Sequence, residues 1–341
     1  MAKRRDKRNK TEARDSNPKE SLAAPALERA KWAGWESKIS RLQQKNLDRI
    51  IQGWANHVPS CQEAGERPLA GIGEISTVAE LFKKVQRDGE LLEPLEGVRS
   101  AILHEAIYLA HKAIHVELGC LELLERGRHT WAVVDAYQSS LFSIASIFAF
   151  LGITIDRDGN DFVLLDAWAV PGHVKRKPGI NLGPEEYGQF IRFNELPHYQ
   201  KWAILQRLFR TLTSESPLID LVARALRHYE EKEFALFRNK VNYNSASWIY
   251  DDLLEGEFEE KIRPVANVQE MVEAISDKEA AGAVYLMILL NEIICMCLGR
   301  ISSAATGAAL SKDFAFMERR RDRISSVVSF DLRDLYVSGE A

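Results

Sequence analysis

The sequence predicts a mainly α-helical protein, a helical bundle with a small insertion that contains a β-hairpin. Apolar residues recur at spacings of three and four over most of the chain, which is the helical period. Glycines 127 and 152 stand where two long stretches of this periodicity end. A third stretch, residues 280–298, is apolar almost throughout. With 341 residues, 46% of them hydrophobic, the chain is long enough to bury such a bundle.

Composition restricts the partners and the compartment. The formal net charge of -4 gives no overall attraction to nucleic acid, so an RNA partner would have to meet a local basic patch. The four cysteines are scattered and lack the spacing of redox or zinc motifs. We therefore predict reduced, mostly buried thiols, a cytoplasmic protein, no cofactor and no metal site.

The first 94 residues divide into two predicted parts. Residues 1–24 form a basic tail, with six basic residues among the first ten and no apolar stretch of a secretory signal. Residues 25–94 form a helical extension, with one long helix or two short ones over 25–56 and a connector over 60–73. Thr77 and Glu80 have the spacing of a capping box, which predicts another short helix.

Residues 95–335 form the main predicted domain, and it opens with a helical hairpin. The two helices cover residues 98–125 and 130–151, and Gly127 and Gly152 end them. Small residues recur along the second helix, and they predict a close approach of the helix over residues 218–241. These small residues are Ala136, Ser140, Ser143, Ser146 and Ala149.

An insertion, residues 153–197, follows the hairpin. A turn at 156–159, a strand at 162–165 and a second strand near 167–170 are predicted there. A basic loop follows, which either binds phosphate or is simply solvated; its cations are Lys175, Arg176 and Lys177. Trp202 begins a further helix.

Residues 218–248 are predicted to form one long amphipathic helix that ends in a polar cluster, the best functional candidate in the chain. Arg238 and Asn242 are four residues apart and share a helix face, so we expect them to face a ligand. Asn239 and Tyr243 share another face, and we expect them to hydrogen-bond within the bundle.

The C-terminal part is predicted to close the bundle. A helix is expected near residues 268–275, followed by the apolar run 280–298. Asn291 and Glu292 inside that run disfavour a membrane span, so we predict a buried core helix and no membrane association. The basic run 319–323 is predicted to be solvated.

Three histidines of the first hairpin helix, His104, His111 and His115, fall within about 40° of one another on one face. A pair spaced by four can bind a metal, but no acidic residue lies in register with this stripe. We interpret it as a histidine stripe at the edge of a packed face.

Two of these helices resemble the HEPN superfamily of small helical bundles. The hairpin helix runs from Ala136 and Tyr137 to Leu151 and Gly152, as in HEPN members. The later helix carries the pair Arg238 and Asn239, followed by Tyr243. The resemblance covers residues 95–152 and 218–303.

The resemblance implies a homodimer and a site for RNA or nucleotide. Catalytic HEPN proteins are metal-independent ribonucleases in which an arginine is followed, after four to six residues, by a histidine. Here Tyr243 stands in that window, and a phenol with a pKa near 10 is a poor general base at neutral pH.

Three functions therefore stay open. We expect foremost a module that binds RNA or nucleotide or mediates assembly with a protein partner, as used in bacterial stress and antiviral defence. The second is a toxin-like metal-independent endoribonuclease with Arg238 and Tyr243 as catalytic residues, of the kind found in toxin–antitoxin systems. The third is a purely structural partner subunit.

Overall fold

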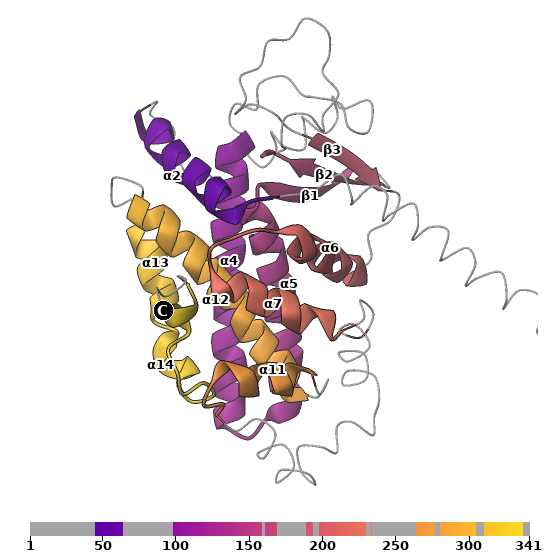
Figure 1. Cartoon of the computed structure of the whole chain (residues 1–341), viewed down its shortest axis with the longest axis vertical. Coiled ribbons are helices and arrows are strands. Elements are labelled where there is room, and N and C mark those ends of the chain that lie inside the picture. The colour runs from indigo at the N-terminus through magenta and orange to yellow at the C-terminus, as the bar shows by residue number, and fades with distance from the viewer. Residues whose placement is uncertain are drawn as a thin grey trace, which may run out of the picture. The chain divides into compact units, whose positions relative to one another are not determined.

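Helices dominate the computed structural model, as the sequence predicted (Figure 1). The structure describes residues 45–63, 98–158, 161–168, 189–193, 198–229, 233, 264–276, 280–304 and 310–336. All of these belong to one unit, residues 41–341. The predicted tail, the capping box at Thr77 and the predicted boundaries at residues 24 and 94 lie outside the described residues.

A hairpin of two long helices, α4 (Val98–Glu125) and α5 (His129–Phe150), forms one side of this unit. Gly127 adopts a φ of 68° in the connection, a conformation that glycine reaches without steric cost. Gly152 has a φ of 75° after α5, and a Cβ there would lie 2.1 Å from Cδ1 of Trp168. Both predicted glycine stops are confirmed, and the helix ends agree with the prediction to within one residue.

The small residues of α5 bring it close to α4 and to α12 (Ala280–Ala304). The Ser139 hydroxyl donates to the Ala113 carbonyl at 2.8 Å, and the Ser146 hydroxyl donates to the Ala106 carbonyl at 2.7 Å. The predicted direct packing of α5 on the helix beginning near residue 218 is wrong for residues 217–227, the described part of that helix, because α5 packs chiefly on α4 and α12. Serine hydroxyls that bond to carbonyls of the neighbouring helix explain this choice of partner.

The central helix is α12, which contacts the hairpin helices α4 and α5. It also contacts α2 (Leu47–Glu63), α7 (Pro217–Arg227), α11 (Val268–Ser276) and α13 (Ser311–Glu318). Residues 284–298 are all buried, so this helix is surrounded on every side and is the predicted core helix. Among the described residues, α5 and most of α12 are long and apolar enough to cross a bilayer, a test that buried core helices also meet.

Three antiparallel strands follow α5 in the order β1 (Ile153–Asp158), β2 (Asp161–Asp166) and β3 (Gln189–Phe193). The predicted strand at 162–165 is part of β2. The predicted turn at 156–159 is wrong for residues 156–158, which continue β1 because they pair with residues 161–163 of β2.

The second strand predicted near residues 167–170 is also wrong where the structure describes it. Ala167 and Trp168 form a turn. The Asp166 carboxylate accepts a hydrogen bond from the Trp168 backbone N–H at 3.0 Å, and this local bond ends the strand.

The helix predicted over residues 218–248 ends much earlier. It is α7 (Pro217–Arg227), and α6 (His198–Thr211) precedes it as predicted. The Gln206 side-chain amide of α6 donates to the carbonyls of Leu226 and Tyr229 at 3.0 and 2.8 Å. These side-chain bonds add to the turn bond that the Tyr229 N–H donates to the Leu226 carbonyl, and they stabilise a helix end at Arg227.

At the N-terminal side, α2 (Leu47–Glu63) continues past the predicted end at residue 56 and into the predicted connector. Its apolar face extends to the buried Val58, and Trp54 donates to the Phe150 carbonyl at 2.7 Å. The helix α11 (Val268–Ser276) stands where the sequence predicted it.

The chain closes with α13 (Ser311–Glu318), α14 (Arg321–Ile324) and the 3₁₀ helix η4 (Leu332–Leu335). The basic run 319–323 was predicted to be solvated, which is wrong for Arg320, whose side chain is fully buried. Arg319 and Arg323 are exposed. The prediction of buried thiols is confirmed for Cys120, Cys295 and Cys297, and burial raises the pKa of Cys297 to about 12.

Candidate functional site

The site residues predicted from the sequence lie outside the residues that the structure describes, so it neither brings them together nor separates them. They are Lys175, Arg176, Lys177, Arg238, Asn239, Asn242 and Tyr243. The described residues offer three other groupings of functional side chains: an exposed aromatic and cationic face, a histidine–serine contact and a buried ionic cluster.

The first grouping lies on the solvent side of the α4–α5 hairpin, and we call it the outer face. From α4 it contains Tyr108, Lys112, His115 and Gly119, which fall within about 60° around the helix axis, and Arg126 follows directly after the helix end. From α5 it contains Trp131, Asp135, Gln138 and Phe142. Tyr108 and Trp131, 48% and 42% exposed, are the largely exposed big hydrophobic side chains among the described residues.

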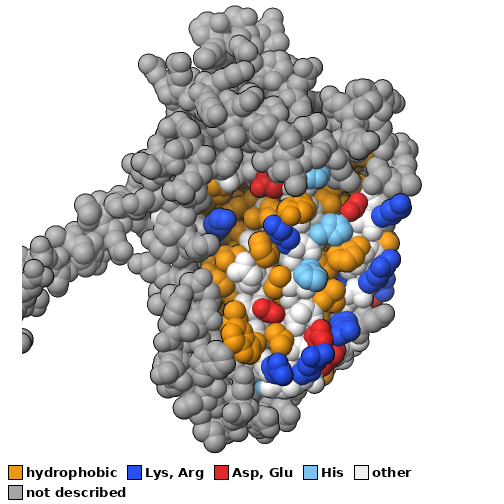
Figure 2. All heavy atoms as spheres, turned by 180° about the vertical axis from the view of Figure 1, so that it is seen from behind, with side chains coloured by type: hydrophobic (Ala, Val, Ile, Leu, Met, Phe, Trp, Pro, Cys, Tyr) orange, Lys and Arg blue, Asp and Glu red, His pale blue; other side chains and the backbone are white. Residues whose placement is uncertain are grey.

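The two helices contribute to one continuous face. Lys112 of α4 lies 5.7 Å from the Phe142 ring of α5, and a Cβ on Gly119 would lie 3.4 Å from the Asp135 carboxylate. Figure 2 shows this side of the molecule, where hydrophobic, histidine and Lys or Arg side chains are interspersed.

Cations and rings alternate at the Tyr108 end of the outer face. The Lys112 ammonium lies 4.5 Å from the centroid of the Tyr108 ring, a cation–π contact. The His104 ring stacks on the Tyr108 ring, with centroids 6.5 Å apart and an interplanar angle of 10°. The Tyr108 ring is therefore held in place while almost half of its surface stays open to solvent.

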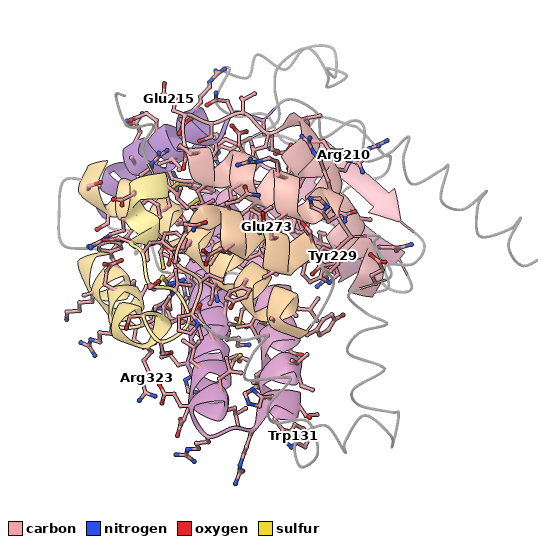
Figure 3. All side chains as sticks on the ribbon, turned by 60° about the horizontal axis from the view of Figure 1, so that its bottom comes forward. Trp131, Arg210, Glu215, Tyr229, Glu273 and Arg323 are labelled. Atoms are coloured by element: carbon pink, nitrogen blue, oxygen red, sulfur yellow. The ribbon has the colours of Figure 1, made fainter. Side chains whose placement is uncertain are left out.

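The other end of the outer face lies at the hairpin connection. Trp131 is one helical turn into α5, and Arg126 and Arg128 beside it are exposed. Figure 3 shows Trp131 at this end of the hairpin. The Cys120 thiol contacts the Ala132 carbonyl, which places Trp131 near the level of Leu121. That level is thirteen residues from Tyr108, or about 20 Å along the axis.

The charge of the outer face is mixed. Glu122 of α4 pairs at 2.5 Å with Arg126, which lies just after the end of this helix. Asp135 lies half-buried between the helices, and burial raises the pKa of its carboxyl. A ligand on this face would therefore be held by ring stacking together with a few cations, and less by a uniformly positive field.

The three histidines of the predicted stripe have separate environments. His111 lies 2.8 Å from the Asp313 carboxylate and stacks against Phe316, so it is at the edge where α13 covers α4. His104 stacks on Tyr108, and His115 is exposed. The described part of the chain holds no group of three or more histidine, cysteine, aspartate or glutamate side chains able to bind a metal.

The second grouping joins α2 to the start of α4. The His57 Nε2 atom lies 3.1 Å from the Ser100 hydroxyl, a pairing that in an open site could activate a nucleophile. Ser100 is only 2% exposed, so a substrate could not reach it in this conformation. Burial, together with the charge of Arg99, lowers the pKa of His57 to about 4, so the ring is neutral at pH 7.

The surroundings of His57 indicate a packing role. The Arg99 guanidinium lies 3.8 Å from the Trp168 ring, and Trp54 contacts both Trp168 and His57 edge-on. We interpret this grouping as a junction between α2, α4 and the end of β2. The sequence gives no signal for it, because His57 and Ser100 are 43 positions apart.

Next to this junction, Lys45 and Asp166 form a buried ion pair at 2.7 Å. Each side chain is only 3% exposed. The pair fixes the residues before α2 to the end of β2, and sequence spacing could not have indicated it, since 121 positions separate the partners.

The third grouping is a buried ionic cluster between α4, α12 and the C-terminal segment. Arg320 donates from Nη1 to Glu292 Oε1 at 2.6 Å, and its Nε lies 3.0 Å from Glu117 Oε2. The Tyr336 hydroxyl donates to the other oxygen of Glu292. Sequence reasoning missed this cluster because Arg320 stands in a run of cations and because Glu117 belongs to a distant helix.

Comparison with known proteins adds nothing to these three groupings. No protein family matches the sequence, and neither a curated protein nor a solved structure matches the chain. A functional inference therefore depends on the side chains themselves and on the motif residues quoted for the HEPN resemblance.

Proposed function

We propose that this protein is a HEPN-like helical module that binds single-stranded RNA, with the outer face of the α4–α5 hairpin as part of its binding surface. The observation that carries the proposal is the exposure of Tyr108 and Trp131 beside Lys112 and Arg126. Bases stack on exposed aromatic rings whatever their sequence, and neighbouring cations bind the phosphates. The HEPN type and the role in bacterial defence are supported by the sequence resemblance alone.

The size of the outer face suits an extended strand better than a lone nucleotide. Tyr108 and Trp131 are separated by about 20 Å along the helix axis, so one base cannot stack on both. A strand of several nucleotides can stack one base on Tyr108 and another base on Trp131. Lys112 and His115 lie between the two rings, where the backbone of such a strand would pass.

Binding of fluorescently labelled single-stranded RNA tests the proposal. Each stacked base is worth about 1–3 kcal/mol, so Tyr108→Ala and Trp131→Ala should each weaken binding roughly 5- to 150-fold. Arg210→Ala is a matched control, because Arg210 is an exposed cation on α6, away from Trp131 (Figure 3). Equal affinity of all the variants and the wild-type protein would contradict the proposal.

Arg238 provides an independent test of the predicted polar cluster. If Arg238 faces a ligand, Arg238→Ala weakens RNA or nucleotide binding and changes the free energy of unfolding by less than about 1 kcal/mol. If it is a buried ion-pair partner, the same change costs about 3–5 kcal/mol and leaves binding intact. Titrating the variant with RNA and with mononucleotide, beside its urea unfolding curve, separates the two roles.

The other functions give different results in the same assays. A metal-independent ribonuclease would shorten the labelled RNA in the presence of a chelator, and Tyr243→Phe would abolish that cleavage. A structural subunit would bind no RNA. The proposed homodimer is tested by light scattering at micromolar concentration, where a monomer would count against it.

A further inference from the structure

The C-terminal segment, residues 310–336, lies across α4 and α12, and we call it the strap. Its regular elements are short, with eight residues in α13 and four each in α14 and η4. Its apolar side chains point into the unit, while the side chains between them are largely exposed. The buried ones include Leu310, Met317, Ile324, Val327 and Leu332.

Arg320 enters the core from the middle of the strap, between α13 and α14. It meets Glu117 of α4 and Glu292 of α12, and all three side chains are 0% exposed. Two carboxylates buried side by side without a cation would repel each other and lack the solvation they have in water. The guanidinium therefore holds together a slot whose walls belong to two different helices.

The slot is suited to a guanidinium in particular. Nη1 of Arg320 donates to Glu292 and its Nε lies 3.0 Å from Glu117 Oε2, so one planar guanidinium meets carboxylates of two different helices. The Tyr336 hydroxyl contacts Glu292 and thereby orients it. A lysine ammonium is a compact point charge and would not offer the same two directions.

The C-terminal end of the strap is held through its own backbone groups. Arg300 of α12 donates to the Tyr336 carbonyl, and the Ser216 hydroxyl donates to the Leu335 carbonyl at 2.7 Å. Val328 pairs with Val265 in an isolated parallel bridge. The later part of the strap is thus held by residues of several different elements. Arg320 is the buried charged contact nearer the middle of the strap.

We propose that Glu117 and Glu292 form a guanidinium-binding slot which Arg320 occupies in cis, and that this contact latches the strap, so that the strap opens as a unit when the guanidinium leaves. The slot holds α4, α12 and the strap in one register. Opening would expose the carboxylates, the apolar seat of the strap and the α13 side of His111, whose partner Asp313 belongs to the strap.

Native-state hydrogen exchange of the wild-type protein gives the first test. The latch predicts that amides of residues 310–336 open together in low denaturant, in a step distinct from the global unfolding that exposes α5. Exchange of the strap and of α5 through one common global step would overturn the proposal.

Chemical rescue gives the second test. In Arg320→Ala, strap amides should exchange about 100-fold faster, in an opening step that still lies below the global unfolding that exposes α5. Ethylguanidinium at a concentration well below denaturing levels should restore much of the strap protection, and ethylammonium, the matched control, should not. No difference between the two cations would overturn the assignment of the slot.

A triple variant keeps the rescue test informative if Arg320→Ala does not fold. Glu117→Gln, Glu292→Gln and Arg320→Met together remove all three charges, so the slot should close without a stranded carboxylate and the variant should fold. Its strap should then be insensitive to ethylguanidinium. Protection of the triple variant by ethylguanidinium would show that the cation acts elsewhere and would contradict the proposal.

Discussion

Helix α4 carries a glutamate–arginine contact on each of two sides, and the two differ in burial. Glu122 and Arg126 pair on the outer face with side chains 46% and 64% exposed, whereas Glu117 and Arg320 pair in the core with none of their surface exposed. An exposed pair within one helix gains little, because water solvates both charges in its absence. A buried pair leaves a stranded charge when one partner is lost. The same two residue types therefore form a solvated pair outside, on the face proposed to bind RNA, and a structural contact inside.

The largest effect is expected for the buried side of this comparison. Arg320→Met should lower the free energy of unfolding by about 3–5 kcal/mol, because Glu117 and Glu292 then face each other without a cation. Urea denaturation measures the loss. Adding Glu117→Gln and Glu292→Gln should recover most of it, and a triple variant as unstable as the single one would contradict the charge argument.

A polar contact without formal charge should have the next largest effect. Ser143 of α5 donates to the Asn291 side-chain oxygen at 2.6 Å, and the Asn291 amide donates to Ser139. Ser143→Leu adds volume to a tight helix contact and removes a partner of Asn291, at a cost of about 3 kcal/mol. Thermal and urea unfolding check this, with Gln138→Leu on the solvent side of α5 as the matched control, expected to be nearly neutral.

Acid should weaken the α2–α4 junction by a smaller amount. The folded pKa of His57 is about 4, below its ordinary value of 6.5, so the unfolded chain binds more protons between these pH values. The contribution of the neutral ring is therefore complete above pH 6.5 and is lost as the pH falls toward 4. Because His57 is partly exposed, we expect a loss of about 2 kcal/mol.

The pH dependence of His57→Gln provides the check. Urea midpoints measured between pH 7 and pH 4 should fall less steeply for this variant than for the wild-type protein. Parallel slopes for the two proteins would show that other groups account for the acid sensitivity.

The smallest effect is expected for the exposed side of the comparison. Arg126→Ala should change the free energy of unfolding by no more than about 0.5 kcal/mol, since its pair with Glu122 is open to solvent. Its RNA affinity should fall, and the salt dependence of binding should become shallower. A stability loss as large as that of Arg320→Met would remove the contrast between the two sides of α4.

The sequence predicted best where local chemistry decides the structure. Gly127 and Gly152 located the ends of the hairpin helices because few other residues tolerate a positive φ. The helix after Pro217 was predicted too long, because its end is stabilised by Gln206 of another helix and no local breaker marks it. The strand predicted after Asp166 was wrong because a side-chain bond to Trp168 competes with strand propensity.

The candidate site was less predictable. Tyr108 and Trp131 are exposed because α12 covers the other face of the hairpin. Sequence periodicity alone does not predict which face is covered when small and large apolar residues surround a helix. Arg320 was assigned to solvent from its basic neighbours, although its carboxylate partners lie 28 and 203 positions away. Ion pairs between distant segments have no local signature.

The central claim is that α4 carries a face proposed to bind RNA on its outer side and a structural contact on its inner side. The most direct test of this claim is the RNA affinity of the folded double variant Tyr108→Ala/Trp131→Ala. We predict a loss of affinity for single-stranded RNA of at least roughly 30-fold, since two stacking platforms are removed. We also predict a smaller loss in the free energy of unfolding than for Arg320→Met, because nearly half of each side chain is exposed. Wild-type affinity in the folded double variant would contradict the claim.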